Sequence, residues 1–186
     1  MEKGELTFIT GGVRSGKSAF AEHLATEYAQ ESGKNLHYIA CGIPFDGEMQ
    51  ERILRHQEDR VHSGFQWDTW EQPKYITEIA ERFTSQDIIL LDCVTTLLNN
   101  YLFQQNMNDP NEALKLVVQD ITSLCEQAGT VLVVSNEVLQ DMPYTDEFTL
   151  DYQSILGNVH QQIVKLANTA ILVESGIPIY KKGRFA

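Results

Sequence analysis

The 186-residue chain is 42% hydrophobic and 22% charged, which is typical of one globular domain that buries its own core. It carries 26 acidic against 14 basic residues, so its formal net charge is -12. A surface of that sign is repelled by the backbone of nucleic acids and by anionic membranes, and we expect neither as a partner. A small anion such as a nucleotide is not excluded, because basic groups can be concentrated locally.

The cysteines and the N-terminus indicate a cytoplasmic protein. Cys41, Cys93 and Cys125 are odd in number and far apart, so they predict neither a disulfide framework nor a zinc site. Residues 1–5 lead directly into a predicted strand and lack the apolar core of a signal peptide. No apolar run approaches the roughly 20 residues that span a bilayer, so we expect no membrane insertion.

Strands and helices are predicted to alternate along the chain. Aliphatic runs predict strands at 6–10, 36–40, 88–92, 130–135, 170–174 and 178–182. Apolar periodicity and end signals predict helices at 17–31, from Asp46 onward, from Pro110 to a stop at Gly129, and at 147–167. This alternation is typical of an α/β fold, with a mostly parallel sheet and helices on both faces. No repeat or linker divides the sequence, so residues 1–186 are expected to form one domain.

The clearest functional signal is segment 11–18, which reads Gly-Gly-Val-Arg-Ser-Gly-Lys-Ser and matches the P-loop pattern G-x-x-x-x-G-K-[ST]. Its glycines let the loop curl so that backbone N–H groups form an anion nest at a helix N-terminus. Lys17 is placed to reach the outer phosphates of a nucleoside triphosphate, and the Ser18 hydroxyl to ligate Mg²⁺. A chance match is the alternative, but the segment also lies between a predicted strand and a predicted helix, as phosphate binding requires.

A carboxylate ends the aliphatic strand predicted at 88–92. Asp92 can hold the Mg²⁺ shell, as a strand-end aspartate does in P-loop enzymes. Hydrophobic strands that end in Asp are common, so this signal is weak by itself. In a chain with a P-loop, it predicts that Asp92 and Ser18 share the metal.

A histidine lies between two arginines at helical spacing. Arg52, His56 and Arg60 are four residues apart and share one face if the helix persists. Two fixed cations disfavour protonation of the imidazole, and a neutral imidazole is a nucleophile for phosphates that the arginines could hold. From the spacing alone, a solvated helix face explains the pattern better, because acidic neighbours could neutralise the arginines. The histidines without this setting are expected to be structural or exposed: His23, His37, His62 and His160.

Further motifs extend the pattern along nearly the whole chain. In order, they are Tyr38-Ile39-Ala40, Asp46-x-Glu48-Met49-x-x-Arg52-Ile53-x-x-His56, Trp67-x-Thr69-x-Glu71-x-Pro73, Leu90-Leu91-Asp92-Cys93-Val94-Thr95, Val134-Ser135-Asn136-Glu137-Val138 and Glu174-Ser175-Gly176-Ile177-Pro178. With the P-loop, these colinear stretches resemble the bifunctional adenosylcobinamide kinase and adenosylcobinamide-phosphate guanylyltransferase family of cobalamin biosynthesis. The Arg-Ile-x-x-His and Ser-Asn-Glu-Val elements are its distinctive parts.

The resemblance implies two reactions in one protein. The first phosphorylates the aminopropanol hydroxyl of adenosylcobinamide with ATP or GTP. The second moves GMP from GTP to that phosphate through a guanylylated histidine, which gives adenosylcobinamide-GDP and pyrophosphate. His56 falls on the guanylylated position, so the resemblance reverses the interpretation favoured by spacing, and Lys17 is the other expected catalytic residue.

The resemblance also implies a homotrimer with a RecA-like P-loop NTPase sheet. The nucleotide-binding residues that it implies are Gly11, Gly12, Val13, Arg14, Ser15, Gly16, Lys17, Ser18, Cys41, Gly42, Ile43, Arg60, Glu71 and Asp92.

The chain departs from the family pattern after its Ser-Asn-Glu-Val element. The family usually continues with a Gly-rich segment, an Arg-x-Phe-Arg-Asp run and Gly-x-x-Asn-Gln, whereas this chain has 139–145, 150–154 and Gly157-x-x-His160-Gln161. Two alternatives therefore stay open beside the bifunctional enzyme. One is a divergent P-loop kinase that acts on another alcohol without GMP transfer, and the other is a nucleotide-binding switch module.

Overall fold

The structure is a computed structural model that describes residues 3–43, 54, 57–58, 60–62, 64–104, 109–137 and 147–183. Its strands are β1 (Glu5–Gly11), β2 (Asn35–Ala40), β3 (Trp67–Glu71), β4 (Asp87–Asp92), β5 (Thr130–Asn136), β6 (Thr169–Glu174) and β7 (Ile177–Lys182). Its helices are α1 (Lys17–Ser32), α3 (Thr77–Ala80), α4 (Val94–Gln104), α5 (Pro110–Gln127) and α6 (Glu147–Leu166). Residues 57–58 and 60–62 are also helical.

The strands form one sheet in the order β3-β2-β4-β5-β1-β6-β7. All neighbours are parallel except β6 and β7, which form the antiparallel pair at one edge. The central strands β4 and β5 are buried on both faces, as parallel strands covered by helices must be. The predicted α/β class with a mostly parallel sheet is confirmed, as are the strands predicted at 170–174 and 178–182, which pair with each other.

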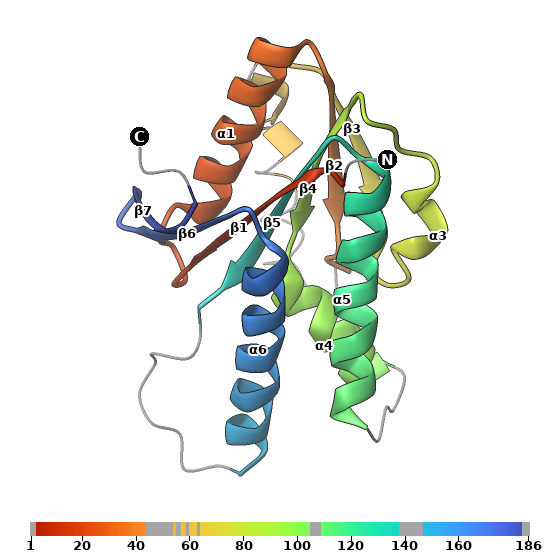
Figure 1. Cartoon of the computed structure of the whole chain (residues 1–186). Helices are drawn as coiled ribbons and strands as arrows, with labels where there is room; N and C mark the ends of the chain where they lie inside the picture. The colour runs from red at the N-terminus through yellow and green to blue at the C-terminus, as the bar shows by residue number, and fades with distance from the viewer. Residues whose placement is uncertain are drawn as a thin grey trace.

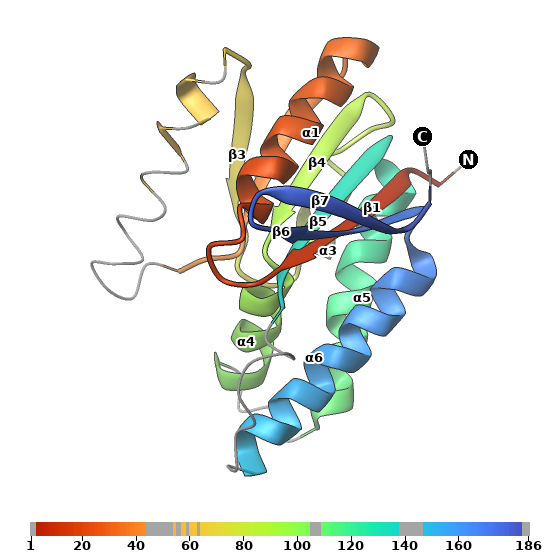
Figure 2. The same cartoon turned by 90° about the vertical axis from the view of Figure 1, so that its left-hand side faces the viewer.

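Helices cover both faces of the sheet (Figures 1 and 2). Alternate residues of each strand point to opposite faces, so β4 sends Ile88 and Leu90 toward α1 and sends Ile89 and Leu91 toward the helices on the other side. One apolar core therefore lies under α1, and a larger one lies under α3, α4, α5 and α6. The two cores support the sheet from both faces. Because its strands are mostly parallel, their carboxyl ends lie along one edge.

Local sequence signals explain where two helices begin and end. Gly16 precedes α1 with φ 86°, and Gly33 follows it with φ 70°, both in the left-handed region that favours glycine. The Asp109 side chain accepts a hydrogen bond from the backbone N–H of Asn111 at 2.9 Å, and Pro110 takes the first turn of α5. The predicted start of α5 at Pro110 is confirmed, and the helix ends at Gln127, two residues before the expected stop at Gly129.

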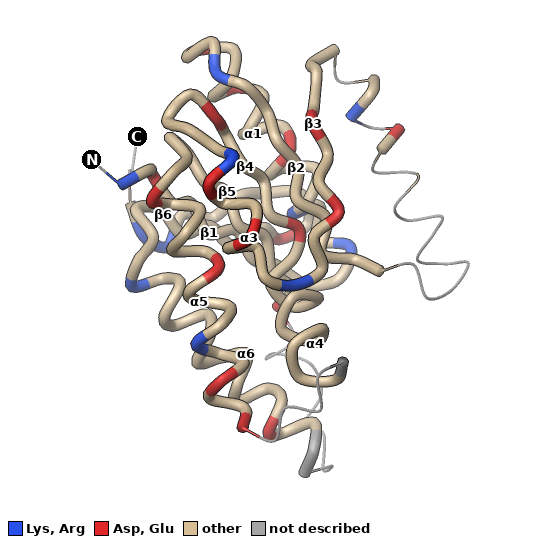
Figure 3. Tube along the Cα trace, turned by 90° about the vertical axis from the view of Figure 1, so that its right-hand side faces the viewer, with Lys and Arg blue, Asp and Glu red and all other residues tan. Residues whose placement is uncertain are grey.

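Charged residues of both signs are mixed along the chain, and the cysteines are not paired. Lys and Arg are interspersed with Asp and Glu along the described trace in the view of Figure 3. All three cysteines are buried, and within the described residues none is in a disulfide. No helix in the described part of the chain has the length and apolarity needed to cross a bilayer.

Candidate nucleotide-binding site

The P-loop sits between β1 and α1, as its sequence predicts. The backbone N–H of Ser15 donates to the carbonyl of Gly12 at 3.2 Å, and Phe20 N–H donates to the carbonyl of Gly16 at 2.9 Å, where the loop becomes helix. Arg14, with φ 59°, takes the left-handed conformation, which gives the loop its curl. A Cβ on Gly11 would lie 2.5 Å from the Ser15 hydroxyl and from the carbonyl of Val173, so only glycine fits there.

The turn between β6 and β7 packs against the P-loop. Gly176 N–H donates to the carbonyl of Ser15 at 2.8 Å, and the Gly176 Cα would lie 3.3 Å from a Cβ on Gly16. Gly16 and Gly176 have φ values of 86° and 80°, which favour glycine, and the hydrogen bond between the two turns fixes the loop against the last strand pair. The Glu-Ser-Gly-Ile-Pro motif thereby acquires a structural role at the phosphate cradle.

The cradle combines backbone donors with a buried cation. Lys17 is 5% exposed, and its Nζ lies 3.3 Å from the carbonyl of Gly12. Ser18 is half-buried on the first turn of α1, where the helix dipole favours an anion. Backbone N–H groups, an ammonium and a helix N-terminus together form a site for the phosphates of a nucleotide.

Three predicted residues meet at the carboxyl ends of neighbouring strands. Ala40, the last residue of β2, pairs in register with Asp92 of β4 and with Glu71 of β3. Cys41 follows β2 directly, and its N–H donates to the carbonyl of Asp92 at 3.1 Å. Ligands of open α/β sheets bind at this edge, so the topology brings Asp92, Glu71 and the start of 41–43 to the side of the sheet that carries the P-loop.

Two of the implied nucleotide-binding side chains are buried. Cys41 is fully buried in the core under α4, and burial raises the pKa of its thiol well above the usual range. Arg60 is 5% exposed, with its Nη1 3.5 Å from the Glu22 carboxylate of α1. The solvated helix face considered from spacing alone is therefore wrong at Arg60.

The chain matches known proteins over nearly its whole length. Residues 7–180 match the family model described as cobinamide kinase / cobinamide phosphate guanyltransferase. The chain belongs to this family. The bifunctional adenosylcobalamin biosynthesis protein CobU of Escherichia coli (strain K12) is 31% identical over 185 residues, covering 94% of this chain and 98% of that protein. The corresponding CobP protein of Pseudomonas aeruginosa is 32% identical over 179 residues, covering 94% of this chain and 96% of that protein.

Solved structures support the fold of this cobinamide kinase / guanyltransferase family member. A KaiC-like protein from Pyrococcus horikoshii OT3 superposes with a TM-score of 0.54 at 12% identity, covering 98% of this chain and 80% of that one. The flagellar accessory protein FlaH from Methanocaldococcus jannaschii gives a TM-score of 0.51 at 14% identity, over 99% and 80% of the two chains. By sequence, the RecA protein of Anaplasma marginale (strain Florida) is 27% identical over 74% of this chain and 39% of its own length. The RecA-like P-loop fold is confirmed.

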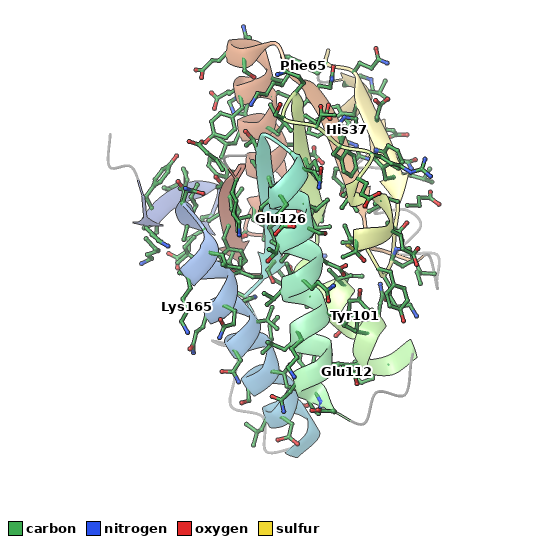
Figure 4. The ribbon with its side chains drawn as sticks, turned by 45° about the vertical axis from the view of Figure 1, so that its right-hand side comes forward. His37, Phe65, Tyr101, Glu112, Glu126 and Lys165 are labelled. Carbon is green, nitrogen blue, oxygen red and sulfur yellow. The ribbon has the colours of Figure 1, made fainter. Side chains whose placement is uncertain are left out.

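Two predicted residues of the family site, Arg52 and His56, lie outside the described residues, as do the predicted helix start at Asp46 and the divergent segment 139–145. The four other histidines are structural or exposed, as expected. His23 and His62 are exposed. His37 is buried, with its Nε2 3.1 Å from Asp87 Oδ1, and Figure 4 shows it on the sheet.

The structure also shows residues that sequence analysis did not single out. Tyr38 donates a hydrogen bond from its hydroxyl to Asp92 Oδ2 at 2.9 Å. On the other face, the hydroxyls of Thr95 and Ser135 lie 3.1 Å apart, and Ser135 Oγ lies 2.8 Å from His160 Nε2. Tyr38 and Ser135 stand in the family motifs, but a motif alone does not say which side chain its residues contact.

Proposed function

We propose that this protein phosphorylates cobinamide with ATP or GTP and then transfers GMP from GTP to the cobinamide phosphate. The observation that carries the proposal is a P-loop cradle on the same edge of the sheet as Asp92, in a chain whose residues 7–180 match the cobinamide kinase / guanyltransferase family. Adenosylcobinamide is the expected form of the corrinoid, and adenosylcobinamide-GDP with pyrophosphate are the expected products.

In the kinase step, the chain positions the phosphates and neutralises charge. The backbone N–H groups of 11–18 and the ammonium of Lys17 would hold the triphosphate, with donors that need no reorganisation during transfer. The oxygens of Ser18 and Asp92 fit Mg²⁺, which prefers hydroxyl, carboxylate and phosphate oxygens. When bound, Mg²⁺ would supply positive charge that offsets the negative charge of the phosphates during transfer.

In the transfer step, we infer that His56 is the nucleophile. Its imidazole would attack the α-phosphorus of GTP, forming an N–P bond as the bond to pyrophosphate breaks, and the cobinamide phosphate would then displace the imidazole. The assignment rests on the position of His56 in the Arg-Ile-x-x-His motif. Cys41, Gly42, Ile43, Arg60 and Glu71 complete the proposed nucleotide site.

Mass spectrometry of adenosylcobinamide incubated with the protein, Mg²⁺ and GTP tests both reactions together. Adenosylcobinamide-GDP is the expected product. Adenosylcobinamide phosphate alone would favour a kinase without GMP transfer. An unchanged corrinoid beside slow GTP turnover would favour a switch module, and either of these results contradicts the bifunctional proposal.

The histidine has its own test, which is labelling with α-labelled GTP followed by denaturation. An acid-labile label, as a phosphoramidate gives, is expected on the parent protein and absent from His56→Ala. This variant should lose GMP transfer and keep kinase activity, because γ-phosphate transfer needs only the P-loop, Mg²⁺ and Asp92. GMP transfer at the parental rate in His56→Ala would remove the covalent role. His62→Ala is a matched control, because His62 is exposed and its Nδ1 lies 2.7 Å from the carbonyl of Glu58.

We further propose that the protein is a cytoplasmic homotrimer, on the strength of the family resemblance. Light scattering coupled to gel filtration should give three times the chain mass of 21.1 kDa. A monomer at micromolar concentration would contradict the trimer and would place the whole corrinoid site within one chain.

A further inference from the structure

Tyr38 is buried beside the carboxylate proposed to serve the metal. Its side chain is 6% exposed on β2, and its hydroxyl donates to Asp92 Oδ2 at 2.9 Å. Burial and the negative charge of Asp92 raise the pKa of Tyr38 well above its ordinary value. A carboxylate can only accept, so the phenol is the donor in this contact.

The ring of Tyr38 is held on its face and at its edge. The Arg60 guanidinium stands over the ring at 3.6 Å from its centroid, which is cation–π geometry. Trp67 of β3 packs against the same ring at 80° between planes, with centroids 6.4 Å apart. Contacts from two directions thus fix the ring, and with it the position of the hydroxyl that donates to Asp92.

Arg60 links this ring to the helix that follows the P-loop. Its Nη1 lies 3.5 Å from Glu22 Oε1, and Glu22 is on α1, five residues after Lys17. The chain of contacts therefore runs from α1 through Arg60 and Tyr38 to the end of β4. These elements carry the P-loop lysine and serine, the helical residues 60–62 and the proposed metal carboxylate.

We propose that Tyr38 is a positioning residue of the nucleotide site: it holds one oxygen of Asp92, orients the other for the Mg²⁺ shell, and is itself braced by Arg60. This inference rests on the proposed function, because it takes Asp92 to be the metal carboxylate. A half-exposed carboxylate at a strand end could be satisfied by water alone. A buried phenol directed at it restricts the orientation of the carboxylate, which solvation by water would leave open.

The test is Mg²⁺ affinity in the presence of a saturating non-hydrolysable GTP analogue, measured by titration calorimetry. Tyr38→Phe keeps the ring and removes the hydroxyl, so it should weaken Mg²⁺ binding about tenfold, the effect of one hydrogen bond to a charged group. Affinity for the analogue in EDTA should stay within about twofold of the parent, because the P-loop is untouched. Tyr28→Phe is the matched control, since it removes a half-buried hydroxyl from the same core without contacting Asp92.

A second variant tests whether the contact of Arg60 with the Tyr38 ring matters for Mg²⁺ binding. Arg60→Lys keeps a positive charge opposite Glu22 and loses the planar group over the ring, so Mg²⁺ binding should weaken about threefold. In the Tyr38→Phe background, the same change should add little, because the contact acts through the hydroxyl. If Arg60→Lys weakens Mg²⁺ binding equally in the parent and in Tyr38→Phe, then Arg60 does not act through Tyr38.

Asp92→Asn separates failure of this inference from failure of the proposed function. If Asp92→Asn weakens Mg²⁺ binding and Tyr38→Phe does not, Tyr38 has no positioning role and the proposed site stands. If neither variant changes Mg²⁺ binding, Asp92 is not the metal carboxylate, and both the role of Tyr38 and the proposed metal site are wrong. An equal loss of analogue affinity in EDTA for Tyr38→Phe would show a general structural role and overturn the inference.

Discussion

Lys17 is a buried cation whose position is explained by a ligand. Its side chain is 5% exposed, and burying an ammonium is costly unless polar groups compensate it. The carbonyl of Gly12 at 3.3 Å gives part of that compensation, and the phosphates would supply an opposite charge. The residue is thus placed for ligand binding rather than for packing.

Lys17→Ala should reduce both activities at least about a hundredfold, the loss expected when one preorganised charge donor is removed. The fold should survive, because the apolar contacts of α1 come from other residues. Initial rates of both reactions together with circular dichroism would measure this. Lys165→Ala on the exposed face of α6 is the control, and parental turnover in Lys17→Ala would remove the P-loop from the mechanism.

His160 is a buried histidine whose titration should affect stability. It is 8% exposed, and burial lowers its pKa to about 4, from about 6.5 in an unfolded chain. Between those pH values the unfolded chain binds more protons than the folded one, so stability is present above pH 6.5 and falls as pH drops toward 4. The total contribution is on the order of 3 kcal/mol, and it levels off below pH 4.

Urea unfolding between pH 4 and 7 measures this effect. His160→Gln keeps a polar group near Ser135 and has no proton to gain, so its free energy of unfolding should fall less steeply than that of the parent. His23→Gln removes an exposed histidine and should keep the parental slope. Identical slopes for His160→Gln and the parent would show that His160 is not buried in its neutral form.

At the scale of elements, a buried tyrosine joins α4, α5 and the loop before α3. Tyr101 donates to Asp120 Oδ2 at 2.6 Å and accepts from the N–H of Tyr75 at 2.8 Å, and Thr77 N–H donates to Asp120 Oδ1 at 3.1 Å. Figure 4 shows Tyr101 beside α5. Burial raises the pKa of both Asp120 and Tyr101, so the carboxylate depends on these donors for its compensation.

Tyr101→Phe should lower the free energy of unfolding by about 2–4 kcal/mol, because it removes both a donor to a buried carboxylate and the acceptor of the Tyr75 N–H. Urea denaturation at pH 7 would measure the change. Tyr180→Phe, at a more exposed position on β7, should change stability by less than about 0.5 kcal/mol. A loss below about 1 kcal/mol for Tyr101→Phe would contradict this role.

Elements with strong local signals can be predicted from the sequence, whereas elements that depend on their packing partners cannot. The buried aliphatic strands and the capped helices were confirmed because burial and capping are written in consecutive residues. By contrast, β3 is a five-residue edge strand with an exposed Asp, Thr and Glu, and α4 contains Thr and Asn pairs that weaken helix propensity. Both form because β2 and the core under α5 give them somewhere to pack.

The same distinction applies to the candidate site. The place of the P-loop between β1 and α1 and that of Asp92 at the end of β4 could be predicted, because each depends on consecutive residues. The burial of Arg60 could not, because it depends on Tyr38 and Glu22, which lie 22 and 38 positions away in sequence and meet it only in the fold. Side-chain contacts between distant elements are set by topology, and spacing within one helix does not reveal them.

At the scale of the whole molecule, the site occupies one edge of a single sheet that both cores support. The chain carries a net charge of -12, while the cradle itself uses backbone N–H groups and Lys17. Anion binding here is therefore a local property, produced by the loop and the helix N-terminus against the sign of the rest of the molecule. Occupation of that edge ties β1, α1 and β4 together, so it should stabilise the protein as a unit.

Mg²⁺ with a non-hydrolysable GTP analogue should therefore raise the melting temperature of the whole chain. At about a hundred times the dissociation constant, a ligand that binds only the folded state adds about 2.7 kcal/mol. For a chain of this length, that corresponds to an increase of roughly 5–10 °C in one cooperative transition. Differential scanning calorimetry should show a smaller increase at the same analogue concentration in EDTA and almost none in Lys17→Ala. An equal shift in Lys17→Ala would place the bound nucleotide away from the P-loop, and two separate transitions would show that the site does not stabilise the sheet as one unit.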